Sequence, residues 1–220
     1  MPGEFILTFP GAYHAGFSTG INIGEAVNFV SRSWFDHGFK CQEIYRKTRE
    51  KIPVFPIDWL IIENVLYLRK SEGHLDLQTR IRLRDAFNKI LREEKKARDT
   101  LERTLRAVRG AVSSSSPQIF EMMEERDHVS EDHYQCHYCT DFAYISVIQC
   151  KVHNFHYCIY HQIMCGCSQE NIKLIYRYST KELDEMEKTL AESCSNTRLV
   201  EKKEQQAKGA TNFTSAIPAH

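Results

Sequence analysis

The chain has 220 residues, 42% of them hydrophobic and 11% aromatic, with 29 basic and 29 acidic side chains. This composition excludes a globally disordered chain and a wholly basic nucleic-acid binder. No run of about 18 uninterrupted apolar residues is present, so neither a transmembrane helix nor a membrane partner is expected. The N-terminus lacks a secretory signal, which favours a reducing compartment where the eight cysteines indicate metal binding rather than disulfides.

Residues 1–32 combine apolar, β-branched and glycine residues. The segment FILTF, residues 5–9, predicts a short buried strand that the following Pro-Gly pair ends. Glycines then recur every four residues up to Gly24, with strand-like residues between them. This pattern predicts turns and further short strands.

A mainly helical region is expected over residues 33–110, where apolar residues recur at helical spacing. The expected helices cover residues 33–50, 59–68 (with Asp58 as cap) and 77–110. The last of these would be roughly 50 Å long if unbroken, and it holds eleven Arg or Lys against five Asp or Glu. Its basic face, which includes Arg98, Arg103 and Arg106, is either simply solvated or contacts DNA, RNA or an acidic partner.

The rest of the chain divides by composition into four parts. These are a linker and acidic segment (111–132), a cysteine-rich segment (133–178), a short helix (179–195) and a polar disordered tail (196–220). Ser179 and Glu182 have the spacing of a capping box at the start of the short helix.

Six of the eight cysteines lie between Cys136 and Cys167, together with histidines at ligand spacing. The candidate ligands form four short pairs: Cys136 and Cys139, Cys150 and His153, Cys158 and His161, Cys165 and Cys167. Because tetrahedral zinc takes four N or S ligands, eight ligands fit two ions. The imidazoles favour zinc over an iron–sulfur cluster. One zinc with spare cysteines, or disulfides, are the alternatives.

The four pairs can be divided between two ions sequentially or in an interleaved order. We favour the interleaved order, which gives one ion Cys136, Cys139, Cys158 and His161, and the other ion Cys150, His153, Cys165 and Cys167. Spacing alone does not decide between the two orders. Four protein ligands leave no open position for water, so both sites are expected to be structural and to supply folding free energy.

Two separate segments resemble JARID-type lysine demethylases. FPGAYHAGFSTGINIGEAVNF, residues 9–29, resembles the last strands of a JmjC domain, and the segment from Trp34 to Arg46 looks like the helix that follows it. The cluster from Cys136 to Cys167, with Tyr176-Arg177-Tyr178 after it, is similar to the C5HC2 zinc finger of the same group. The resemblance implies an α+β chain, in which the terminal strands of a JmjC double-stranded β-helix precede a mainly helical domain with a two-zinc C5HC2 finger.

The resemblance also implies a chemistry. JmjC enzymes are Fe(II)- and 2-oxoglutarate-dependent dioxygenases that hydroxylate a lysine methyl group, which is then lost as formaldehyde. JARID-type members act in the nucleus on the tri- and dimethylated lysine-four mark of histone H3, so the implied partners are the H3 tail and chromatin. By resemblance, His14 matches the distal histidine of the iron triad and Asn28 matches a polar position lining the pocket.

The rest of that site has no counterpart in this sequence. Residues 1–13 contain no histidine, and the family's 2-oxoglutarate anchors are missing. Since a facial triad needs three protein ligands, the chain is expected to be catalytically incomplete unless the preceding half of the JmjC domain is supplied. We therefore expect a C-terminal fragment or truncated relative of a demethylase. The alternative is a non-enzymatic, zinc-dependent module that contacts chromatin or nucleic acid.

Overall fold

The computed structural model describes residues 4–31, 34–70, 75–109, 120–122, 134–162, 166–167 and 171–195. The elements are α1 (Trp34–Thr48), α2 (Ile57–Lys70), α3 (Leu77–Arg109), β1 (Phe120–Met122), β2 (Ser146–Cys150), β3 (Phe155–Tyr157) and β4 (Ile172–Tyr176), followed by a helix over residues 180–195. Three helices therefore precede a small sheet, which is an α+β arrangement. None of the helices in the described ranges is long and apolar enough to cross a membrane.

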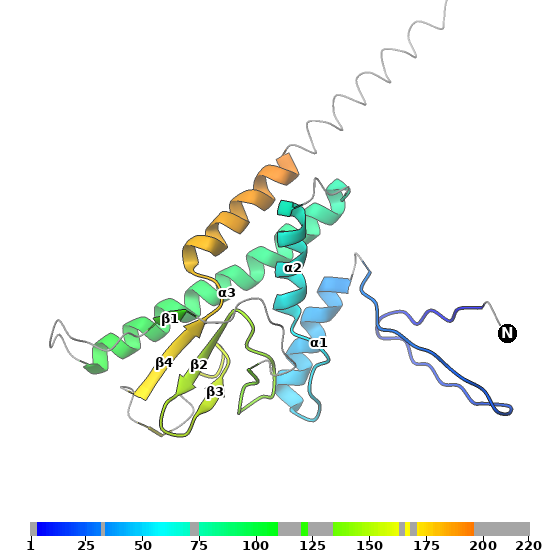
Figure 1. Cartoon of the computed structure of the whole chain (residues 1–220), viewed down its shortest axis with the longest axis horizontal. Helices are drawn as coiled ribbons and strands as arrows, with labels where there is room; N and C mark the ends of the chain where they lie inside the picture. Colours follow the sequence, from blue (N-terminus) through cyan, green and yellow to red (C-terminus); the bar gives the residue numbers. More distant parts are fainter. Residues whose placement is uncertain are drawn as a thin grey trace, which may run out of the picture.

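α3 connects the two hydrophobic cores of the molecule. It runs for 33 residues without a break, and Asp76 caps its start by accepting the backbone N–H of Thr79 at 2.9 Å. Figure 1 shows α1 and α2 against the first half of α3 and the sheet along its second half. The first core joins α2, the first half of α3 and the C-terminal helix, whereas the second joins Leu101 and Leu105 of α3 to the sheet and the cysteines.

α1 and α2 approach each other closely at a glycine. A Cβ placed on Gly38 would lie 2.4 Å from the Trp34 ring and 2.7 Å from Cδ1 of Ile57, so only a residue without a side chain fits between them. α2 begins at Ile57. Asp58 therefore lies inside its first turn, and the prediction that Asp58 precedes the helix as its cap is wrong.

The sheet has the strand order β1-β4-β2-β3. β1 runs parallel to β4, whereas β2 is antiparallel to both β3 and β4. The helix after β4 starts with the predicted capping box, because the N–H of Glu182 donates to Ser179 Oγ at 3.2 Å and the N–H of Ser179 donates to the Glu182 carboxylate at 2.8 Å. The linker at 111–119, most of the acidic segment, Cys165 and the tail at 196–220 lie outside the described residues.

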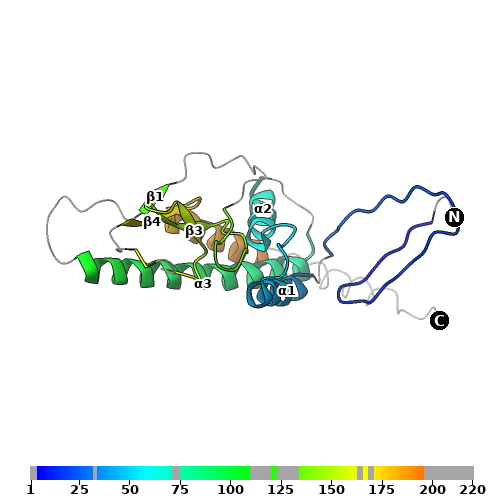
Figure 2. The same ribbon diagram turned by 90° about the horizontal axis from the view of Figure 1, so that it is seen from below.

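Residues 4–31 form no strand and bury no core, so the predicted buried strand at 5–9 is wrong. Phe5 is 98% exposed, Ile6 97% and Phe17 91%. In both views the segment stands apart from the helices and the sheet (Figures 1 and 2). The physical reason is that a strand is buried by partner strands, and none of the described residues supplies one. These residues therefore do not form a β-helix among themselves.

Candidate metal centre

The structure brings four of the predicted ligands together in one cluster, called here the first cluster: Cys136, Cys139, Cys158 and His161. Their ligand atoms all lie within 4.8 Å of one another. Cys136 and Cys139 belong to the turn before β2, and Cys158 and His161 to the turn after β3. The cluster therefore combines the first and third pairs along the chain.

The distances within the first cluster fit a tetrahedral ion. The sulfurs of Cys139 and Cys158 are 3.8 Å apart, and Nδ1 of His161 lies 3.2 Å from Cys158 Sγ and 3.7 Å from Cys136 Sγ. With Zn–S bonds of about 2.3 Å and a Zn–N bond of about 2.0 Å, a tetrahedron places two sulfurs about 3.8 Å apart and a sulfur and a nitrogen about 3.5 Å apart. The donor set and its spacing therefore fit zinc.

The turn that carries the first ligand pair is held by its own backbone. The N–H of Thr140 donates to the carbonyl of Cys136 at 2.8 Å, and the N–H of Cys136 donates to the carbonyl of Asp141 at 2.8 Å. Thr140 has a φ of 61°, a left-handed conformation that is costly for a β-branched residue. This turn directs the side chains of both cysteines of the pair into the first cluster.

The thiols of the first cluster influence one another's ionisation. Hydrogen bonds from Cys139 and Cys158 lower the pKa of Cys136. The same contact with Cys136 raises the pKa of Cys139 to about 11, and the contacts with Cys136 and Cys139 raise the pKa of Cys158. The three thiols therefore accommodate one negative charge readily and resist further ones. A bound divalent cation would remove that resistance.

Cys150, His153 and Cys167 form a second cluster, whose ligand atoms also lie within 4.8 Å of one another. Nδ1 of His153 is 3.8 Å from Cys150 Sγ and 3.1 Å from Cys167 Sγ. Cys150 is buried at the end of β2, whereas His153 is exposed in the β2–β3 turn. These three residues come from the second and fourth pairs, and the fourth expected ligand, Cys165, lies outside the described residues.

The first cluster is surrounded by residues that sequence reasoning missed. Arg46 of α1 donates from Nε to Oδ2 of Asp141 at 2.5 Å, and its guanidinium lies 3.8 Å from the centroid of the Tyr160 ring. Burial raises the pKa of Asp141, an effect that the Arg46 charge opposes. No spacing signal links Arg46 to a residue 95 positions away, so only the tertiary structure could reveal this contact.

His14 and Asn28 lie on the exposed N-terminal segment, which stands apart from the sheet in Figure 1, and neither belongs to a ligand cluster. Nδ1 of His14 lies 3.2 Å from the carbonyl oxygen of Ala12. Among the described residues, no group of three or more possible ligands includes His14. His14 and its described neighbours therefore do not form an iron centre by themselves.

The three arginines singled out on the basic face of α3 already have acidic partners. Arg98 is buried against Glu94, Arg103 pairs with Asp99 at 2.8 Å, and Arg106 pairs with Glu102 at 2.5 Å. Arg98 does not belong to the solvent-facing side of the helix, so its place in the expected basic face is wrong. The alternation of acids and bases at a spacing of four is a stabilising pattern for a solvated helix.

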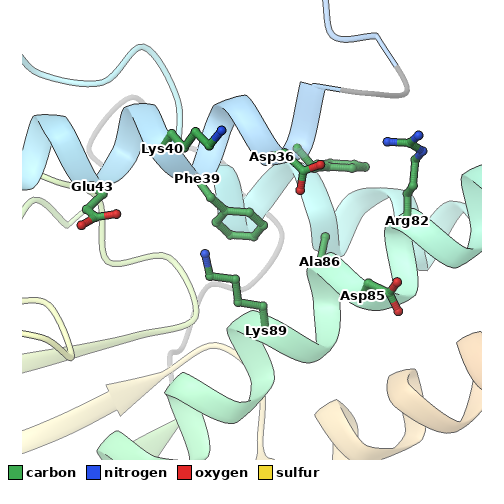
Figure 3. Close-up of a pocket in the computed structure, with 9 residues that line it drawn as sticks. Asp36, Phe39, Lys40, Glu43, Arg82, Asp85, Ala86 and Lys89 are labelled. Atoms are coloured by element: carbon green, nitrogen blue, oxygen red, sulfur yellow. The ribbon is translucent and has the colours of Figure 1, made fainter.

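A pocket of about 470 Å³ lies between α1 and the first half of α3, apart from the cysteine clusters (Figure 3). Its lining residues are Phe35, Asp36, Phe39, Lys40, Glu43, Arg82, Asp85, Ala86 and Lys89. Lys89 Nζ lies 4.0 Å from the centroid of the Phe39 ring, so an internal cation covers this aromatic face. Acidic and basic side chains are equal in number around the pocket, so its lining favours neither a cationic nor an anionic ligand.

Comparison with known proteins places these features in a family. Residues 136–186 match the C5HC2 zinc finger model, and residues 1–29 match the JmjC domain, hydroxylase, model. Lysine-specific demethylase JMJ17 of Arabidopsis thaliana is 30% identical over 187 residues, which is 84% of this chain and 14% of that protein. Lysine-specific demethylase 5B of Gallus gallus is 30% identical over 82% of this chain and 11% of its own length.

Lysine-specific demethylase 5D of Homo sapiens is 31% identical over 84% of this chain and 11% of its own length. The chain thus spans only 11% to 14% of these relatives. The matches confirm the resemblance drawn from the N-terminal segment and the cysteine cluster. The chain, which combines a JmjC match with a C5HC2 zinc finger, is a homologue of the JARID-type lysine demethylases.

Proposed function

We propose that this chain is the zinc-bearing part of a nuclear JmjC demethylase that acts on the tri- and dimethylated lysine-four mark of histone H3. The observation that carries the proposal is the first cluster, a four-ligand cage in a chain that also matches the JmjC domain at its start. The similarity to lysine-specific demethylases over most of the chain supports the same proposal.

Two zinc ions would be held by this chain. The first would bind Cys136, Cys139, Cys158 and His161, and the second Cys150, His153, Cys165 and Cys167. Zinc would fix the two turns on either side of the β2–β3 hairpin, where the strands of the described chain are only five and three residues long. Its role is structural, because four protein ligands leave no position for a reacting water.

His14 would contribute one ligand to the iron of the assembled JmjC domain. Iron with 2-oxoglutarate would supply the oxidation of the methyl group, and Asn28 would line the same pocket. The exposed apolar side chains of residues 4–31 support this role, since they are available to be covered by further strands of the domain. The histone H3 tail would reach that pocket as the substrate.

Zinc content and formaldehyde release test the proposal separately. Elemental analysis should give about two zinc atoms per chain. The chain alone should release no formaldehyde from a methylated H3 peptide with Fe(II), 2-oxoglutarate and ascorbate. The same chain joined to the preceding half of the JmjC domain should release it.

In the joined protein His14→Ala should abolish release and keep both zinc atoms. The exposed His37 provides a matched control, and His37→Ala should leave release unchanged. Turnover by the 220-residue chain alone, or a zinc stoichiometry of one, would contradict the proposal.

A second candidate function is a non-enzymatic module that contacts nucleic acid through α3. Arg92 and Lys96 favour it, because both are exposed on the outer face of α3 and have no ion pair among the described residues. DNA binding that weakens steeply with salt, and that falls in Arg92→Gln/Lys96→Gln, would support this function. Salt-independent binding, or none at low salt, would exclude it.

A further inference from the structure

The last turn of α1 lies against both turns that carry the first cluster. Arg46 pairs with Asp141 at 2.5 Å and lies over the ring of Tyr160 at 3.8 Å. One turn further on, the guanidinium of Arg49 is 4.8 Å from the centroid of the Tyr138 ring. Two arginines of one helix end therefore contact both ligand-bearing turns.

Each of these partners is tied to a ligand of the first cluster. Tyr138 directly precedes Cys139, and Tyr160 directly precedes His161. The carbonyl of Asp141 accepts the N–H of Cys136 at 2.8 Å. An ion that fixes the four ligands would therefore also fix the groups that α1 contacts.

The ion pair that joins α1 to the first of these turns, between Arg46 and Asp141, is largely buried. The side chain of Asp141 is fully buried and that of Arg46 is 18% exposed, so removal of either partner leaves a charge uncompensated away from water. Arg49 has a φ of 57°, a conformation that glycine adopts without strain. Arginine at this position brings a guanidinium to Tyr138 that glycine could not supply.

The turn after β3, which carries Cys158 and His161, also makes hydrogen bonds to α3. The hydroxyl of Tyr160 donates to the carboxylate of Glu93, and Nε2 of Gln162 donates to the carbonyl of Ala97 at 2.9 Å. α3 also carries both hydrophobic cores. The turn that carries Tyr160 is thus attached to α3, and through Arg46 it also contacts α1.

We propose that Arg46 is a positioning residue through which a metal ion at the first cluster fixes α1, and with it the point where the chain leaves the JmjC-matching segment. The match ends at residue 29 and α1 begins at Trp34, so only a short connection separates them. The inference rests on the proposed zinc at the first cluster. Loss of this ion would release α1 without unfolding α3.

Cleavage by endoproteinase Glu-C after Glu43 measures the release of α1 in the whole chain. Glu43 lies within α1, so cleavage requires the helix to open locally. Chelation of zinc from the wild type should accelerate this cleavage by at least about tenfold. Arg46→Gln with its zinc retained should be cleaved about as fast, and chelation should add little. Arg46→Lys, which keeps the charge but not the planar group, should lie between the two.

The matched control is Arg69→Gln, the same substitution at an exposed residue of α2, and it should behave as the wild type. Zinc content is measured in every sample. A zinc-free wild type would refute the zinc proposal and this inference with it. Bound zinc with wild-type protection in Arg46→Gln, or a chelated wild type that stays protected, would overturn only the inference. If Arg46→Gln does not fold, Asp141→Asn is judged by the same criteria from the other side of the contact.

Discussion

The ion pair between Glu94 and Arg98 sits where the two cores of the molecule meet on α3. Glu94 is 2% exposed and accepts from Nε of Arg98 at 2.6 Å and from Ser146 Oγ at 2.5 Å. Arg98 also donates to the carbonyl of Tyr178 at 3.0 Å. These bonds join α3 to β2 and to the segment after β4. Arg98→Met, which replaces the guanidinium with an apolar side chain, is therefore expected to weaken the whole junction.

The expected loss follows from burial. Removing one partner of a buried ion pair costs about 3–5 kcal/mol, because the other charge stays without compensation. For a chain of this size each kcal/mol lowers Tm by roughly 2–4 °C, so Arg98→Met should unfold roughly 6–20 °C lower. Glu94→Gln/Arg98→Met removes both charges and should recover most of that loss.

Thermal and urea unfolding at saturating zinc measure both variants. Arg103→Met is the control on the same helix, since Arg103 and Asp99 are 69% and 66% exposed and an exposed pair at this spacing contributes only about 0.3–0.5 kcal/mol. A loss below about 1 kcal/mol in Arg98→Met, or a double variant no more stable than the single one, would refute the reasoning about buried charge.

Three other substitutions test the local geometry. Thr140→Gly should stabilise the chain by about 1 kcal/mol, because it relieves the left-handed φ at a smaller cost in entropy, and a lower urea midpoint at saturating zinc would contradict this. Gly38→Ala should lose about 1–3 kcal/mol through the clash with Trp34 and Ile57, and an unchanged Tm would refute it. Burial raises the pKa of Asp58 from 3.8 to about 7, so the folded state holds this proton more tightly and the associated stability is lost as pH rises from about 4 to about 7. Asp58→Asn should therefore be more stable than wild type at pH 8, with a Tm that falls less between pH 5 and 8, and equal profiles would contradict the shift.

Local patterns in the sequence predicted much of the secondary structure. The apolar residues from Leu77 onward recur at the spacing that places them on one face of a single helix, and the structure has one unbroken helix, α3, in this place. The capping box of Ser179 and Glu182 is likewise complete within four residues. Such features form from contacts between near neighbours, so the sequence contains all the information that they need.

The ligand types and their short pairs could also be read from the sequence, because two side chains in one turn share a position whatever the rest of the chain does. Which pairs come together could not, since that depends on the hairpin of β2 and β3, which brings the turn at Cys139 to the turn at Cys158. The grouping is a property of strand pairing over a distance in the chain.

Burial of polar and apolar groups was decided by tertiary structure alone. The FILTF segment has the composition of a buried strand, yet its side chains are exposed because the described chain gives it no partner. Arg98 looked like part of a solvated basic face, yet its guanidinium donates to the Glu94 carboxylate and to the carbonyl of Tyr178 where two cores meet. No local pattern indicated the contact of Arg46 with Asp141, because the two residues are 95 positions apart in the chain. Composition determined which residues could form a core or bind a metal, and the contacts between distant segments determined which of them did, because burial depends on neighbours that local sequence does not specify.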